Sequence, residues 1–164
     1  MDSQNNQEEL MNQVTRACEH PSVADVAFKQ FLVSKNPVLC KKLGNGVCVV
    51  LFKEKQAAIS HFDHIEGNPE EYIPRMIKAL HSAQESSSVI EAVLIGGDSD
   101  HIAKCAFMLE KNNIKTIGHY CDNWRDDFVC DAESHLEKLK DIAIIPEEKT
   151  IILFSTASDF VKVV

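Results

Sequence analysis

The chain has 164 residues, of which 45% are hydrophobic, and it carries a formal net charge of −8. This length and apolar content suffice for one domain with a sizeable core. The acidic balance argues against nucleic acid as a partner, because phosphate binding needs clustered Lys and Arg. No run of about 18 apolar residues occurs, so we expect no helix that spans a membrane.

Residues 1–20 are rich in Gln, Asn and Glu, with a few apolar residues at near-helical spacing. This pattern predicts a flexible segment or a loosely attached helix. Residues 21–164 are expected to form a single domain. A strand is predicted from Phe28 to Val33, interrupted at Asn36-Pro37, because the residue before a proline avoids the helical region.

A glycine turn, Leu-Gly-Asn-Gly, precedes Cys48. Gly44 and Gly46 allow positive φ and a close approach of the backbone to a substrate. The amide groups of such a turn, including that of Asn45, can point at a developing oxyanion. We therefore predict that residues 44–46 form the oxyanion loop of a site around Cys48.

Cys48 also opens a predicted hairpin. The apolar run 49–52 is typical of a buried strand, a polar turn follows, and 57–61 is typical of a returning strand. Such a hairpin would carry His61 back beside Cys48, as a nucleophile and its base require. The alternative is that Cys48 is an ordinary buried residue and His61 an ordinary hydrogen-bonded one, since cysteine usually behaves as a small hydrophobe.

Two helices are predicted in the rest of the chain. Asn68 can cap the first, with Pro69 at its first position. Asp98 or Ser99 can cap the second, which closes at Asn112-Asn113. The first has an apolar stripe that we expect to face the core, formed by Ile73, Met76, Ile77 and Leu80. The second carries the apolar residues Ile102, Ala103, Ala106, Phe107 and Leu109.

Apolar runs predict four further strands, at 89–95, 114–120, 142–145 and 151–154, the last two as a hairpin. Gly96 and Gly97 follow the first of these strands, where they can present amides to an anion or simply form a tight turn. Residues 121–140 match no element, and they either shape substrate choice or form a surface excursion. Antiparallel connections without regular strand–helix alternation indicate an α+β protein.

The start of the chain has neither the basic head nor the apolar stretch of a secretory signal. We therefore expect a cytoplasmic protein, or an effector exported without a cleaved signal peptide, whose six cysteines are mostly thiols. We expect no metal site, because no Cys-x-x-Cys occurs and ligand spacing is usually strict. No cofactor is expected either.

Four segments, in this order, resemble motifs of one enzyme family: Lys35-Asn36-Pro37, residues 43–48, Ser60-His61 and Ile95-Gly96-Gly97. They are similar to the Lys-Asn-Pro stretch, the Leu-Gly-x-Gly-Ser-Cys loop, the Ala-His and the Gly-Gly of the CheD family of chemoreceptor glutamine deamidases. The likeness runs from about Phe31 to Phe154. The protein N-terminal asparagine amidohydrolases are more distantly similar.

This resemblance implies layered, largely antiparallel or mixed sheets with helices packed outside. It also implies a cysteine-dependent amidohydrolase that deamidates Gln or Asn side chains of a protein substrate and releases ammonia. Cys48 matches the nucleophile of the family and His61 its base. Gly96 and Gly97 match a wall of the site.

The chain departs from the family at two positions. The third catalytic residue of the family, a threonine, is Lys42 here, and the serine before the nucleophile is Val47. Lys42 can favour a Cys48 thiolate, because a nearby cation lowers a thiol pKa, so we expect Cys48 to be the most reactive thiol. Ser60 can orient His61 instead. The alternative function is that of a catalytically silent binding or regulatory protein of the same fold.

Overall fold

The computed structural model describes residues 2–20, 22–25, 31–41, 47–62, 69–83, 89–96, 99–120, 141–154 and 160–164. Within these ranges the chain forms two five-stranded sheets, three α-helices and one short 3₁₀ helix. The helices are α1 (Asp2–Glu19), α2 (Pro69–Ala83), α3 (Ser99–Lys111) and η2 (Pro146–Glu148).

Each sheet combines strands from distant parts of the chain. Sheet A has, in spatial order, β1 (Ala24–Asp25), β3 (Val38–Lys41), β8 (Asp141–Ile145), β9 (Thr150–Phe154) and β10 (Phe160–Lys162). Sheet B has β2 (Phe31–Ser34), β5 (Gln56–Phe62), β4 (Val47–Lys53), β6 (Glu91–Gly96) and β7 (Lys115–Tyr120). The pairs β1–β3 and β6–β7 are parallel, and the other neighbours are antiparallel.

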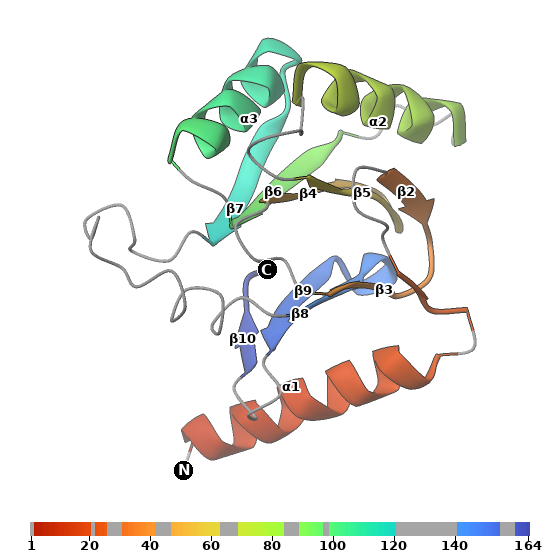
Figure 1. The fold of residues 1–164 in the computed structure, drawn as a ribbon. Helices are drawn as coiled ribbons and strands as arrows, with labels where there is room; N and C mark the ends of the chain where they lie inside the picture. Colours follow the sequence, from red (N-terminus) through yellow and green to blue (C-terminus); the bar gives the residue numbers. More distant parts are fainter. Residues whose placement is uncertain are drawn as a thin grey trace.

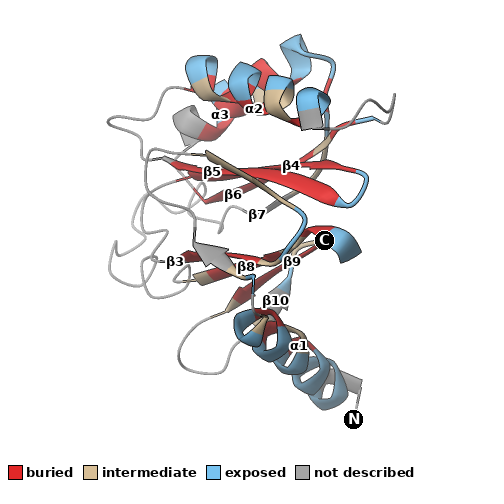
Figure 2. Cartoon of the chain, turned by 90° about the vertical axis from the view of Figure 1, so that its right-hand side faces the viewer, coloured by how far each residue is buried: buried red, intermediate tan, exposed pale blue. Residues whose placement is uncertain are grey.

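The two sheets lie face to face, with α2 and α3 outside sheet B and α1 outside sheet A (Figure 1). Buried residues line both faces of β4, β5 and β6, and the exposed surface lies mainly on the outer sides of the helices (Figure 2). The prediction of an α+β fold, with layered sheets and helices packed outside, is confirmed.

The central strand β4 shows why these layers form. All seven of its residues are buried, because one face meets the helices and the other meets sheet A. Val47, Val49 and Leu51 pack with α2 and α3, whereas Cys48, Val50 and Phe52 lie in the core between the sheets. Each large side chain buried in this way stabilises the fold by about 1.5–3 kcal/mol.

Both predicted central helices are present. α2 begins at Pro69 as predicted, and Ile73, Met76 and Leu80 are buried against sheet B. In α3, the helix buries Ile102, Cys105, Met108 and Leu109, since these positions follow the helical period. Phe107 falls outside this stripe and is 63% exposed.

The N-terminal residues form a packed layer. Leu10 and Val14 of α1 are buried against Leu39, Ala143 and Ile152 of sheet A. The Gln7 side chain donates a hydrogen bond to the carbonyl of Phe160 (2.9 Å) and accepts one from its amide (3.2 Å). α1 therefore contacts sheet A at two places, through its apolar side chains and through Gln7.

The hairpin β8–β9 is confirmed, with Lys149 in the left-handed conformation (φ 54°) closing its turn. The short strand β3 was not predicted. In the part of the chain that the structure describes, no helix combines the length and the apolar character needed to cross a membrane.

Candidate active site

Cys48 and His61 lie directly opposite each other on β4 and β5. Opposed residues of an antiparallel pair project from the same face of the sheet, with Cβ atoms about 4.5–5.5 Å apart. That face is the one toward sheet A, since Cys48 and Ile59, two residues before His61, both belong to the core between the sheets. The predicted hairpin and the juxtaposition of these two side chains are therefore present.

A third residue, Cys40 of β3, meets this pair from the opposite sheet. Its side chain is hydrogen-bonded to both Cys48 and His61. Both cysteines are completely buried, and His61 is 5% exposed. We call Cys40, Cys48 and His61 the thiol cluster. Two thiols and an imidazole thus meet in an otherwise apolar core.

The two thiols of the cluster differ in acidity. The hydrogen bond from Cys48 is the main cause that lowers the pKa of Cys40 from 9.0 to about 6. The hydrogen bond and charge of His61 act in the same direction, while burial and the charge of Asp141 oppose them. The pKa of Cys48 is raised well above 9.0, first by its hydrogen bond to Cys40 and then by burial and by the charge of Cys40.

The expectation that Cys48 has the lowered pKa is therefore wrong. The lowered pKa of Cys40 and the raised pKa of Cys48 favour the negative charge on Cys40, to which Cys48 and His61 are hydrogen-bonded. The reason is that two thiols in contact do not both ionise, because the first charge opposes the second. The cluster as a unit still releases one thiol proton easily.

Of the glycines predicted at the site, Gly96 is described. It ends β6, opposite Val47, and has φ of 77°. A side chain is strained at this angle, so a glycine is needed where the chain leaves the strand beside β4. Its partner Gly97 lies outside the described residues, as do Lys42 and residues 44–46.

Ser60 does not orient His61. Neighbours on a strand project to opposite faces, and Ser60 lies opposite Val49, which packs on the helix side of sheet B. Its hydroxyl is fully buried and has no hydrogen-bond partner among the residues that the structure describes. The third residue at His61 is Cys40, from the other sheet.

Sequence reasoning missed Cys40 because β3 was not recognised as a strand. The segment is short, follows a proline and runs into two lysines. The available signal was the apolar Val38-Leu39-Cys40, in which Val38 and Cys40 share a face and Leu39 has the other. That signal places Cys40 in a core but does not reveal its contact with Cys48.

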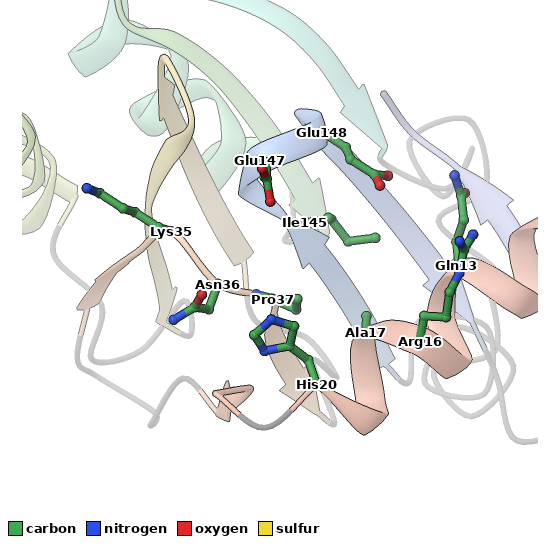
Figure 3. Close-up of a pocket in the computed structure, with 10 residues that line it drawn as sticks. All are labelled: Gln13, Arg16, Ala17, His20, Lys35, Asn36, Pro37, Ile145, Glu147 and Glu148. Carbon is green, nitrogen blue, oxygen red and sulfur yellow. The ribbon is translucent and has the colours of Figure 1, made fainter.

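A pocket of about 180 Å³ lies away from the cluster. Arg16 of α1 and His20 just after it border the pocket, together with the turn before β3 and Glu147 and Glu148 of η2 (Figure 3). None of its lining residues belongs to the thiol cluster. Within the described ranges, no group of three or more His, Cys, Asp or Glu side chains is placed to hold a metal ion.

Comparison with protein-family models and with curated proteins gave no match to this chain. The thiol cluster and the motifs around it are therefore the features that bear on function.

The acidity of Cys40 can be measured directly. We expect the ultraviolet absorbance of a thiolate to titrate with a midpoint near pH 6 in the wild type, at the pKa of about 6 that its partners produce. Cys40→Ser should remove this transition, and Cys48→Ala should shift it to higher pH, because the main hydrogen bond to the thiolate is lost. A transition that survives in Cys40→Ser would place the charge on another residue.

The same lowered pKa links stability to pH. Between pH 6 and 9 an unfolded Cys40 holds a proton that the folded one does not, so the free energy of unfolding rises with pH, by at most about 1.4 kcal/mol per pH unit. This contribution is complete above pH 9 and is lost as the pH falls through 6. Cys40→Ser should lack this slope in denaturant titrations between pH 6 and 8.

Proposed function

We propose that the protein is a cysteine-dependent amidohydrolase that deamidates Gln or Asn side chains of a protein substrate. The observation that carries the proposal is the Cys48–His61 pair, two opposed side chains on one face of sheet B with an ionisable thiol in contact with both. A thiol, an imidazole and a proton acceptor in mutual contact are what thioester chemistry requires. The resemblance of four segments to CheD motifs supports an amide as the substrate group.

The reaction begins with Cys48. Its sulfur attacks the carboxamide carbon while its proton passes to the Cys40 thiolate, which already accepts its hydrogen bond. A thiol of high pKa is a strong nucleophile once deprotonated, so the raised pKa of Cys48 is compatible with this role. The C–S bond forms and the carbonyl π electrons move to oxygen, where the resemblance implies stabilisation by the amides of residues 44–46.

His61 serves the second half of the reaction. It donates a proton to the departing nitrogen, so the C–N bond breaks and ammonia leaves from a thioester on Cys48. Water then attacks the thioester and gives a proton to His61. The C–S bond breaks, a carboxylate is released, and the proton returns to Cys48 so that the thiolate again resides on Cys40.

One observation favours the alternative, a silent binding or regulatory protein. Both sulfurs are completely buried, so a substrate carboxamide reaches them only if the site opens.

For the amidohydrolase we infer a cytoplasmic location, because a reducing compartment keeps both thiols available for catalysis.

The two functions differ in one measurable product. We expect the wild-type protein, incubated with a peptide mixture from a proteome digest, to release ammonia and to convert specific Gln or Asn residues to the acids. Ammonia is measured with a coupled dehydrogenase assay, and the converted residues are found by mass spectrometry. The same mixture without the protein corrects for spontaneous deamidation. Equal conversion with and without the protein would favour the binding function.

A further inference from the structure

Cys40 and Cys48 join the two sheets through their side chains alone. The backbone of Cys40 lies opposite Ile142 in sheet A, and that of Cys48 lies opposite His61 and Ile95 in sheet B. Between the sheets the two thiols are in hydrogen-bonding contact within an apolar cluster. A nucleophile and its base require only one thiol and one imidazole. This cluster has a second reduced cysteine in contact with the first, and the imidazole activates one of the two.

We propose that Cys40 and Cys48 form a redox pair, in which hydrogen peroxide oxidises Cys40 and Cys48 then closes a disulfide between the two sheets. The proposal concerns the oxidation of the thiols and holds whether or not the protein deamidates a substrate.

The first step takes place at Cys40, because the thiolate is the form of cysteine that reacts with peroxide. Its sulfur attacks one oxygen of hydrogen peroxide, an S–O bond forms, and the O–O bond breaks. The sulfur loses two electrons, the peroxide is reduced, and hydroxide leaves. Cys48 and His61 are hydrogen-bonded to Cys40, and the charge of Asp141 also acts on it. His61 can supply the proton that converts hydroxide to water.

The second step uses the neighbouring thiol. The sulfur of Cys48 attacks the sulfur of the Cys40 sulfenic acid, the S–S bond forms and the S–O bond breaks. The hydroxyl group leaves with the proton of Cys48 as water. One peroxide is consumed and two thiols become one disulfide, so no further reductant or oxidant is needed.

The bridge has a structural consequence. The disulfide would link β3 of sheet A covalently to β4 of sheet B through Cys40 and Cys48. It also occupies the Cys48 sulfur, which blocks any reaction that needs this thiol until a dithiol reduces the bridge.

The chain contains two matched controls. Cys105 of α3 is also completely buried, but burial raises its pKa to about 12. Cys18 of α1 is exposed and lies on the outer layer. Comparing the oxidation rates of Cys40 and Cys105 separates the effect of the thiol cluster from the effect of burial. Comparing the rates of Cys40 and Cys18 separates the effect of the cluster from that of access to solvent.

The test treats the full-length wild-type protein with hydrogen peroxide at pH 7, blocks remaining thiols with N-ethylmaleimide and maps the peptides by mass spectrometry. We expect a disulfide between the Cys40 and Cys48 peptides, reversed by dithiothreitol, and loss of the Cys40 thiol at least about tenfold faster than that of Cys105. If both thiols stay reduced while Cys18 is oxidised, the proposal is wrong.

Two variants assign the steps. Cys48→Ser removes the resolving thiol, so a sulfenic acid at Cys40 should persist and be trapped by dimedone. Cys40→Ser removes the thiolate while burial still raises the pKa of Cys48, so Cys48 in this variant should be oxidised more slowly than Cys40 is in Cys48→Ser. Dimedone labelling of Cys48 in the second variant at least as fast as that of Cys40 in the first would reverse the order of the steps. A Cys40 sulfenic acid that accumulates in the wild type, with no bridge to Cys48, would overturn the disulfide.

Discussion

Cys48→Ala is expected to abolish ammonia release from any substrate that the wild-type protein deamidates. The variant lacks the sulfur that forms the thioester, and neither His61 nor the water molecule can replace a covalent nucleophile at the same rate. Activity should fall to the background of spontaneous deamidation. The measurement is ammonia release under identical conditions, with the near-ultraviolet circular dichroism of both proteins compared to verify that the fold is retained.

The matched control is Cys105→Ala, since Cys105 is as completely buried as Cys48 but packs between α3 and sheet B. Both variants remove one buried sulfur, so a loss of activity caused by packing alone would affect both. A second measurement identifies the nucleophile. When a slow substrate is quenched with acid, the acyl group should be found on the peptide that contains Cys48. An acyl group on Cys40 would transfer the nucleophilic role to that residue.

His61→Ala is expected to lower kcat by about a hundredfold to ten-thousandfold, the range that a general acid or base typically contributes. The imidazole donates to the departing nitrogen and accepts from the attacking water, so its loss slows both halves of the reaction. KM should change less, because His61 acts on the reacting atoms rather than on the rest of the substrate. Steady-state kinetics on the same substrate measure both values.

The cluster supplies a second measurement for this variant. Because the hydrogen bond and charge of His61 help to lower the pKa of Cys40, His61→Ala should also move the thiolate midpoint above pH 6. A suitable control is His20→Ala, since His20 lies at the end of α1 beside the pocket of Figure 3. Equal effects of the two substitutions on kcat and on the midpoint would contradict the role that we give to His61.

Much of the local structure follows from the sequence. The apolar run of β4 and its return through β5 have strand length and are separated by a polar turn, so the hairpin that pairs Cys48 with His61 could be predicted. The start of α2 at Pro69 could also be predicted from the sequence, because proline suits the first turn of a helix. In each case the determining interactions lie within a few residues along the chain.

Other features depended on periodicity that the sequence carries only weakly. In α3 two alternative apolar stripes overlap, and contact with sheet B selected the one that includes Cys105 and leaves Phe107 exposed. The polar segment of α1 has few apolar residues, yet three side chains of sheet A cover Leu10 and Val14. Helix propensity and amino-acid composition are weak predictors of the buried face of a helix where tertiary contacts decide that face.

The sequence by itself determined which thiol and which imidazole meet on one face of sheet B, since strand alternation and a short turn set that pairing. Only the tertiary structure decided which thiol ionises. Cys40 reaches Cys48 and His61 from another sheet, and no local pattern encodes a contact between faces of two sheets. A thiol pKa depends on the hydrogen bonds and charges around the sulfur, so the acidic thiol of the cluster became identifiable only when the two sheets were packed together.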